Sequence, residues 1–206
     1  MKRILLTLTV FVAGLSVIAP DINAQTKPRG SEFQERMDAW HKDMAEFRAR
    51  SEHNRELNEL ADSLAGVQAM AAVRNQDFVL EADQVTFKNG MTTFVNSNTN
   101  FISVKGNRAV VQISPSNFAS GPNGLGGVTV DGMITDKQIM KDKKGRITYT
   151  INVMGVGINA QVDVFMVPGT NRASATIYPN FNSNTVWVQG DIVPYSSSNV
   201  FEGNSL

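Results

Sequence analysis

The stretch Asp77–Ile113, DFVLEADQVTFKNGMTTFVNSNTNFISVKGNRAVVQI, decides the fold of this 206-residue chain. In its first part apolar side chains alternate with polar ones, with one break in the alternation: Phe78, Leu80 and Ala82, then Val85 and Phe87. Such alternation is typical of a β-strand with one buried face. Asn89-Gly90 predicts a tight turn after this strand, and the segment 105–108 predicts another between strands at 101–104 and 109–113.

The same pattern continues towards the C-terminus. Val128–Ile134 is a predicted strand, followed by a polar connection and a turn at Asp142–Gly145. Four more alternating segments follow, at 146–155, 159–167, 173–179 and 185–194. No alternation of strands with helices is present, which argues against a parallel sheet. We therefore expect an α+β chain whose antiparallel β meander of about 8–10 strands forms a barrel or a strongly curved sheet.

The first residues have the composition of a secretory signal peptide. Lys2 and Arg3 precede an uncharged apolar run, and a cleavage site follows Ala24. The run is too short to span a bilayer comfortably, and no later segment approaches the length required. The chain contains no cysteine, so it has neither a disulfide nor the modified cysteine of a lipoprotein. We expect a protein of the periplasm or the extracellular space, without a transmembrane segment in the mature chain.

The rest of the chain divides into four parts by composition. A flexible lead-in at 25–30 contains Pro28 and Gly30, and a helical arm of one or two helices follows at 31–73. The β domain is expected at 74–195, and a flexible tail at 196–206. Ser31 and Gln34 fit a capping box at the start of the arm.

The first part of the arm has an apolar face, which we call the arm seam. Its residues recur at spacings of four and three: Phe33, Met37, Trp40, Met44 and Phe47. Such a face more often packs on its own domain than forms a coiled coil, which usually needs three or four heptads. A monomer is therefore favoured over a homodimer, and self-association or a partner helix remains the alternative.

A second apolar series begins ten residues after Phe47. Its members are Leu57, Leu60, Leu64 and Val67, and at 100° per residue the seam is rotated by about 80°. The segment between the two series is polar on all sides, which predicts a bend near Ser51–Asn54 or a helix surrounded by water there. We expect the second series to pack on the sheet.

The charge balance excludes some partners. Lys plus Arg and Asp plus Glu both number 19, so the net charge is zero. A chain without a basic field is a poor ligand for nucleic acid or an anionic membrane. We therefore expect no nucleic-acid partner, and no motif in the chain indicates a cofactor.

A glycine-rich stretch at Ser116–Gly132, SNFASGPNGLGGVTVDG, stands out from the alternating segments. A phosphate-binding glycine loop leads into a helix N-terminus, whereas Gly126-Gly127 leads into a predicted strand. We interpret the stretch as a loop in which glycines permit positive φ or close backbone approach. Because loops on a rigid sheet often carry contacts, its candidate ligand or partner residues are Asn117, Phe118, Asn123 and Leu125.

Catalytic candidates are few. His41 and His53 lie on different faces of the arm, and no metal site is expected. The β domain has neither histidine nor cysteine, which excludes the common nucleophile pairs there. Glu81 and Asp83 share a strand face; we interpret them as its solvent side, and a carboxylate-based hydrolase is the minor alternative. The aromatic residues Tyr178, Phe181, Trp187 and Tyr195 are candidates for a sugar-binding platform.

The ordered segments FISVKGNRAVVQI, GPNGLGGVTVDGMI, DKKGRITYTINVMG, NAQVDVFMVPGTNRASATIYP and VWVQGDIVP resemble an exported Bacteroidetes family that shares the domain of unknown function DUF4251. The resemblance covers roughly Leu60–Pro194. It differs where some family members have an aromatic PYFG-like stretch and this chain reads SPSNFASG. The resemblance implies an exported protein with a charged helix before the domain, and it implies no catalytic residues.

Three functional hypotheses follow. The leading one is a non-catalytic, exported protein of the cell envelope whose β domain binds a protein, a glycan or an apolar ligand. The second is an assembly protein that uses the arm seam, and the third is the hydrolase with Glu81 or Asp83. A filled barrel would favour partners on the surface, and a hollow one would favour an apolar ligand inside.

Overall fold

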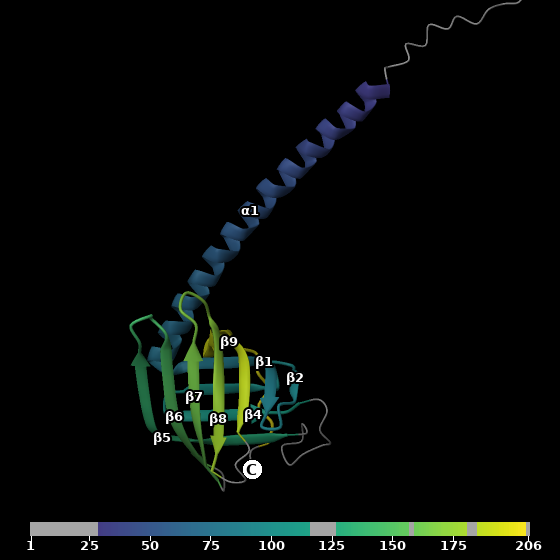
Figure 1. Cartoon of the computed structure of the whole chain (residues 1–206). Helices are drawn as coiled ribbons and strands as arrows, with labels where there is room; N and C mark the ends of the chain where they lie inside the picture. The colour runs from purple at the N-terminus through teal and green to yellow at the C-terminus, as the bar shows by residue number, and fades with distance from the viewer. Residues whose placement is uncertain (1–28, 116–126, 157–158, 181–184, 205–206) are drawn as a thin grey trace, which may run out of the picture. The chain divides into compact units, whose positions relative to one another are not determined.

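The computed structural model describes residues 29–115, 127–156, 159–180 and 185–204. The chain divides into two compact units, 1–51 and 52–206. In the first unit the described residues are helical. The second unit contains the last turns of that helix and all of the strands (Figure 1).

One helix, α1 (Arg29–Asn75), accounts for the predicted arm. It is assigned without a break, so the polar segment around Ser51–Asn54 is helical and exposed. In the first unit three large members of the arm seam are 53–65% exposed: Phe33, Trp40 and Phe47. Met37 and Met44 are partly exposed.

The helix contacts the β domain with small residues, and our expectation for the second apolar series was wrong. Leu57, Leu60, Leu64 and Val67 are all exposed. The buried residues of this part of α1 are instead Gly66, Ala69, Ala72 and Val73. A Cβ atom at Gly66 would lie only 2.8 Å from the backbone nitrogen of Thr170. This interface is therefore made of small side chains, because they let the helix backbone closely approach the turn that contains Gly169 and Thr170.

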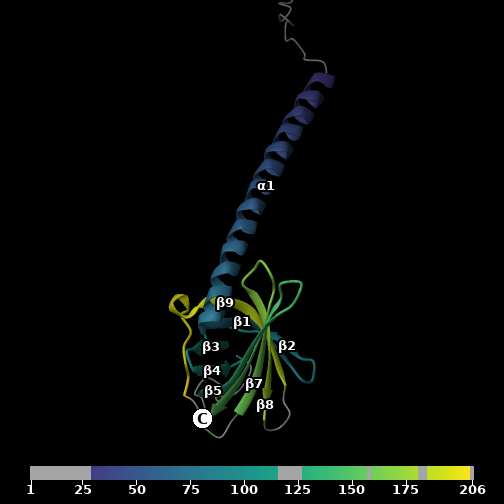
Figure 2. The same cartoon turned by 90° about the vertical axis from the view of Figure 1, so that its left-hand side faces the viewer.

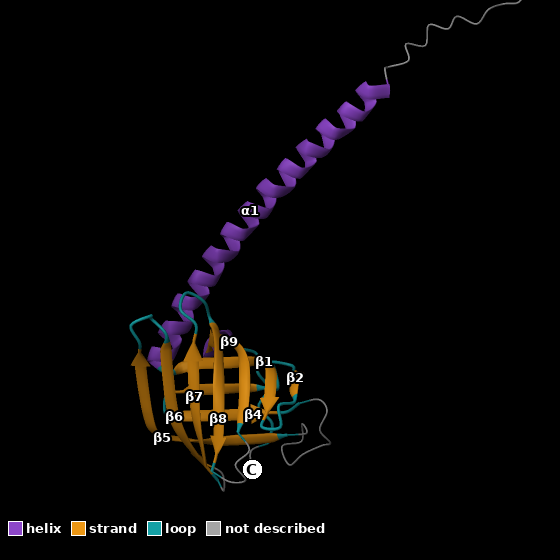
Figure 3. Ribbon diagram, viewed as in Figure 1, coloured by secondary structure: helices purple, strands orange, loops and turns teal. Residues whose placement is uncertain are grey.

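Nine strands of the described residues form one antiparallel sheet. They are β1 (Asp77–Phe87), β2 (Thr92–Phe94), β3 (Phe101–Lys105), β4 (Arg108–Ile113), β5 (Val128–Lys141), β6 (Ile147–Gly155), β7 (Asn159–Met166), β8 (Arg172–Pro179) and β9 (Val186–Pro194). The order is β2-β1-β3-β4-β5-β6-β7-β8-β9, and β1 also pairs with β9. Eight strands thus close into a barrel, and β2 is an extra strand on β1. The predicted meander and its barrel are confirmed (Figure 3).

The closing pair β1–β9 contains the break in alternation seen in the sequence. Its register shifts between Ala82 and Gln84, which is a β-bulge. The bulge explains why Val85 faces the interior although it is three residues from Ala82. Gly190 of β9 lies opposite Ala82, where a Cβ atom would overlap the carbonyl oxygen of Glu81. A glycine is therefore required where the two strands meet most closely.

The barrel interior is filled with apolar side chains. Its largest members include Phe78, Leu80, Ile102 and Tyr149, and all four are fully buried. Ala69, Ala72 and Val73 of α1 belong to the same core cluster. An eight-stranded barrel is just wide enough for side chains to fill it. The filled interior directs the search for a ligand site to the outer surface.

Strand β5 is longer than predicted. The polar segment Thr135–Lys141, expected as a connection, continues β5 beyond a register shift at Ile134/Asp136 and pairs with β6. Its polar composition is explained by its position: among the described strands, β4 pairs only with the first half of β5, so the second half is a sheet edge. The start of the predicted strand, Val128, is confirmed.

A second, smaller core lies outside the barrel. Val79, Phe101 and Val110 are buried on the outer face of β1, β3 and β4. Val193, Tyr195 and Val200 pack against them. The segment expected as a flexible tail, 196–206, is described as far as residue 204, and it lies along the outside of these strands (Figure 2).

Candidate functional site

The candidate contact residues are divided by the structure. Asn117, Phe118, Asn123, Leu125 and Phe181 lie outside the described residues. Trp187 is on β9 and is 41% exposed. Tyr195 begins the 3-10 helix η1 (Tyr195–Ser197). The two described members therefore occupy different elements.

Trp187 lies on the outer face of the barrel in a row of polar residues. It pairs with Thr86 of β1 and with Thr176 of β8, and Thr176 pairs with Asp163 of β7. Thr92 of β2 continues the row, because its hydroxyl oxygen lies 2.9 Å from that of Thr86. The indole is thus flanked by hydroxyl groups on both sides.

The next row on the same face carries two more aromatic rings. The register places Phe94 beside Gln84, and Gln84 beside Gln189, and it ends with Ser174 beside Phe165. Phe165 is 43% exposed and Phe94 is 82% exposed. Tyr178, which is 44% exposed, is the neighbour of Gln161 in a third row. We call Phe94, Phe165, Tyr178 and Trp187, with the polar side chains between them, the aromatic face.

The spacing of these rings follows from strand geometry. Tyr178 is a diagonal neighbour of Trp187, roughly 7–8 Å away between Cα atoms. Phe94 and Phe165 are each two strands and two residues from Trp187, which is roughly 12 Å on a flat sheet. Tyr178 and Trp187 are therefore within reach of each other, whereas Phe94 and Phe165 are too far from them to join one compact hydrophobic cluster. The face thus carries the Tyr178–Trp187 pair and two separate rings, with amide and hydroxyl groups between them.

Tyr195 belongs to the outer core and not to the aromatic face. Its ring packs against the buried cluster of Val79, Phe101 and Val110. The Lys105 ammonium lies 4.5 Å from the centre of the ring, a cation–π contact. The predicted platform of Tyr178, Trp187 and Tyr195 is therefore not one surface: Tyr178 and Trp187 share a face, and Tyr195 lies elsewhere.

Charged side chains at the bulge neutralise one another. Arg172 donates to both carboxylate oxygens of Asp83, at 2.6 and 3.1 Å, and lies 3.4 Å from Asp191. The hydrogen bond to Asp83 is the main cause of the raised pKa of Arg172. Glu81 accepts a 2.6 Å hydrogen bond from Ser198. Each of the two predicted carboxylates thus has its own partner, an arrangement that orients the bulge and does not favour acid–base catalysis.

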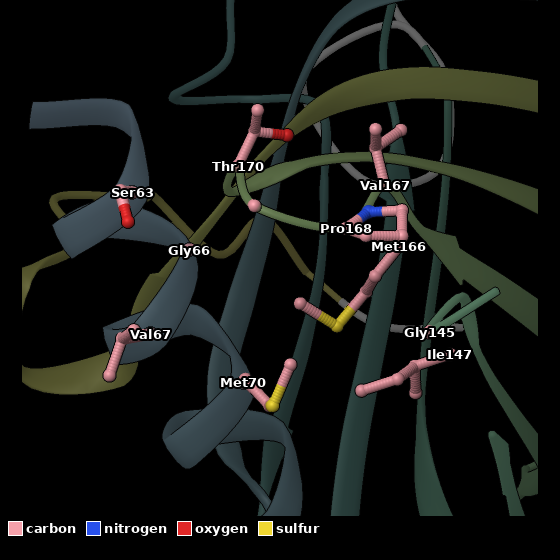
Figure 4. A pocket seen from close by; sticks show the side chains of 11 residues that line it. Ser63, Gly66, Val67, Met70, Gly145, Ile147, Met166, Val167, Pro168 and Thr170 are labelled. Carbon is pink, nitrogen blue, oxygen red and sulfur yellow. The ribbon is translucent and has the colours of Figure 1, made fainter. Parts of the chain in front are cut away.

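A shallow cleft of about 90 Å³ lies between the last turns of α1 and two turns of the barrel (Figure 4). Met70 and Met166 line it from the helix and from β7, and Pro168 and Thr170 from the β7–β8 turn. Pockets for drug-sized ligands usually measure 300–1,000 Å³. The cleft is too small for such a ligand, and it reflects the close approach that Gly66 permits.

The described residues offer no metal site and no membrane-spanning helix. In that part of the chain, groups of three or more His, Cys, Asp or Glu side chains suited to a metal ion are absent. Likewise, no described helix combines the length and the apolar character needed to cross a membrane.

Sequence reasoning missed Phe94 and Phe165 as members of the aromatic face. Both were available as outward positions of alternating strands, since each is one residue from an inward-facing neighbour. What was lacking was the strand register. Phe94 and Phe165 are 71 residues apart in the sequence, and only the closed order β2-β1-β9-β8-β7 brings them to one face.

The fold and the surface together define a filled eight-stranded β-barrel domain whose candidate site is on its outer face. The chain belongs to the DUF4251 family: the family model "Domain of unknown function (DUF4251)" matches residues 62–192. It is similar to a DUF4251 family protein from Bacteroides eggerthii DSM 20697 of known crystal structure, with 46% identity and a TM-score of 0.61, over 69% of this chain and 96% of that one. No curated protein matches the chain.

Proposed function

We propose that this protein is a non-catalytic binding protein of the cell envelope, and that its aromatic face binds a glycan. The observation that carries the proposal is the composition of that face. Three aromatic rings that are 41–44% exposed lie among the side chains of Gln84, Gln189, Gln161 and Thr86. A sugar ring has an apolar C–H face and polar hydroxyl edges, so it needs both kinds of group side by side.

A glycan fits this surface better than the other two ligand classes. An apolar ligand would require a continuous apolar recess, and here amides or hydroxyls separate the neighbouring rings of Tyr178 and Trp187 from those of Phe94 and Phe165. A protein partner of ordinary affinity needs a compact, desolvated centre with its anchors close together. Separate rings with donors and acceptors between them instead suit a chain of sugars, because each ring stacks on one unit while the polar groups orient it.

Binding of the mature chain to an array of bacterial envelope and host glycans tests this proposal. For a glycan that binds, Trp187→Ala is expected to weaken binding about tenfold, which corresponds to about 1.4 kcal/mol. Trp40→Ala is the matched control, because Trp40 is the other tryptophan of the chain and is also exposed, on α1. An array without any ligand, or equal loss in the two variants, would contradict the proposal.

A second candidate function, assembly through the arm seam, is favoured by the exposure of Phe33, Trp40 and Phe47. Large apolar side chains repeated along one helix are typical of a surface that a partner covers. The mass of the mature chain in solution, compared with that of a copy lacking Ser31–Glu56, tests self-association. Trp40→Glu should dissociate a dimer, whereas His41→Glu, one residue away, should not. Equal monomeric masses of both chains would exclude self-pairing.

We also propose export to the periplasm or beyond, after cleavage near Ala24, which is supported by the signal-peptide composition of the first residues. The absence of cysteine argues against a lipid anchor of the lipoprotein type. Cell fractionation of a tagged chain, with mass determination of its N-terminus, tests both points. A protein that keeps its first residues in the cytoplasm would contradict the proposal.

A further inference from the structure

The C-terminal segment after β9 does not pair as a strand; side-chain contacts and one backbone hydrogen bond, from the nitrogen of Phe201 to the carbonyl oxygen of Asn98 at 2.8 Å, hold it to the barrel. After η1 it follows the outer face of β1, β3 and β4 (Figure 2). The strands that it crosses are already paired with their neighbours in the sheet. The segment therefore lies across the barrel surface as a peptide lies in a binding groove.

The side-chain amide of Gln112 forms two hydrogen bonds with the backbone of this segment. Its Nε2 donates to the carbonyl oxygen of Phe201 at 2.8 Å, and its Oε1 accepts from the backbone nitrogen of Gly203 at 2.7 Å. A neighbouring strand would offer the same pair of groups. The amide is fixed in this orientation because Nε2 also donates to Thr99 O at 3.0 Å, and Oε1 also accepts from the Thr129 hydroxyl at 3.0 Å. Gln112 is fully buried, so these bonds are shielded from water.

Alternate side chains of the segment face the barrel. The Ser198 hydroxyl donates to Glu81, Val200 packs on the outer core, and the Glu202 carboxylate pairs with Arg108 at 3.0 Å. Asn199 and Phe201 face the solvent, and Phe201 is 60% exposed. The barrel therefore contacts the side chain of every second residue of the segment, in the pattern Ser-x-Val-x-Glu-Gly.

The groove is built by the strands and not by the tail. Arg108 is held in place by Asp131, to which it donates two hydrogen bonds, at 2.8 and 2.7 Å. Phe101 and Val110 form the apolar floor with Val79. Because these groups are positioned by β1, β3, β4 and β5, they do not depend on the tail for their geometry.

We propose that the outer face of β1, β3 and β4 is a peptide-binding groove whose resident ligand is the chain's own segment Ser198–Gly203. The tail is exchangeable, and an extended peptide with the same alternating pattern takes its place. This groove shares no residue with the aromatic face, so the inference stands independently of the proposed glycan binding. Recognition of a peptide backbone also explains why a glutamine, Gln112, is buried on the outer surface of the barrel.

The test uses the full chain with a protease recognition sequence inserted between Ser197 and Ser198, in the exposed end of η1. The folded protein is cut, the released tail is removed by dialysis, and a fluorescent nonapeptide with the sequence of residues 198–206 is added. We expect saturable binding by anisotropy after cleavage and at least tenfold weaker binding before it, because the tethered tail competes with the peptide for the groove. Absence of binding after cleavage, or loss of the β-sheet circular dichroism when the tail leaves, would overturn the proposal.

Peptide variants test the alternating pattern. Val200→Asp and Glu202→Lys are each expected to weaken binding at least tenfold, because the first brings a charge into the outer core and the second faces Arg108. Asn199→Ala and Phe201→Ala are the matched controls, and they should change the affinity less than threefold. Equal affinities for all four variants would overturn the proposed recognition.

Hydrogen exchange of the uncut chain provides an independent measurement. If the tail opens without unfolding the barrel, the amide hydrogens of Phe201 and Gly203 exchange at least 100-fold faster than those of Val104 and Val110 in β3 and β4. Equal protection of the four amides would show that the tail leaves only when the barrel unfolds, and this would overturn exchangeability.

Discussion

Gly190→Ala tests whether the barrel closes as the structure has it. A Cβ atom at position 190 would overlap the carbonyl oxygen of Glu81, and it would lie 2.7 Å from the carbonyl carbon of Glu81 and 2.8 Å from Cα of Ala82. All of these are backbone atoms, so no side-chain rotation relieves the contact. Strand β1 or β9 must move at the bulge, where Asp83 also meets Arg172.

Two opposing effects set the change in the free energy of unfolding of Gly190→Ala. Overpacking of a well-packed core typically costs 1–3 kcal/mol, and a backbone contact of this kind belongs at the upper end, about 3 kcal/mol. Replacing glycine by alanine lowers the entropy of the unfolded chain and returns up to about 1 kcal/mol. We therefore expect Gly190→Ala to lower the free energy of unfolding by about 2 kcal/mol.

Urea denaturation followed by circular dichroism and tryptophan fluorescence measures the effect. With an m-value of about 2 kcal/mol per molar urea, the midpoint should fall by about 1 M. Gln189→Ala is the matched control: it is the preceding residue of β9 but faces outward, and it should change stability by less than about 0.5 kcal/mol. A midpoint for Gly190→Ala within the range of this control would refute the close approach of β1 and β9 at the bulge.

Three further predictions concern buried groups. Burial raises the pKa of Tyr149 to about 12, so the folded chain holds this proton more tightly than the unfolded one, and stability present below pH 10 is lost as the pH rises towards 12. The urea midpoint should therefore fall less between pH 7 and pH 11.5 in Tyr149→Phe than in the unchanged protein. The exposed control Tyr178→Phe should lose as much as the unchanged protein. Gly66→Ala gains about 1 kcal/mol of helix propensity but brings Cβ within 2.8–3.0 Å of the backbone of Gly169 and Thr170, so the melting temperature should fall. The control Gly30→Ala, with open space around it, should not lower the melting temperature. Asn100→Ala removes a buried amide that accepts from Ser114 N at 2.7 Å and donates to Ser114 O at 3.2 Å, and chemical denaturation should show a loss of about 2–3 kcal/mol, against less than about 0.5 kcal/mol for Asn98→Ala.

Local patterns in the sequence predicted the strands well, because period-2 alternation and turn residues are properties of neighbouring positions. The predicted turn at 105–108 and the strands around it correspond to β3 and β4. The break in alternation after Ala82 marks the bulge. The polar segment Thr135–Lys141 was missed as a strand because its side chains are exposed on both faces of the sheet, so no apolar–polar alternation marks it.

Features that depend on distant partners were not predictable in the same way. The leucines at 57, 60 and 64 have the spacing of a buried face, yet the helix buries Gly66, Ala69 and Val73, because the approach of the β7–β8 turn selects for small residues. The aromatic face needed the β1–β9 pairing, which joins residues 99 to 116 positions apart. The glycine loop stays a prediction as a contact site, since residues 116–126 lie outside the described part. Gly127 beside it is explained by close approach to Ile113 and Ser114, where a Cβ atom would lie 2.7 Å from Cα of Ser114.

The filled interior constrains the ligand more than any single surface residue does. Phe78 and Tyr149 meet edge to face inside the barrel, with ring centres 5.5 Å apart, and small residues such as Ala82 of β1 and Ala173 of β8 belong to the same core cluster. An apolar ligand could enter only by displacing such side chains, and exposing a buried aromatic ring costs about 2–3 kcal/mol before any ligand contact is made. The outer surface carries no such cost, because the rings of Tyr178 and Trp187 are already half exposed in the free protein. For the proposed glycan, recognition on the outside of the rigid barrel is therefore thermodynamically easier than entry of an apolar ligand into its interior.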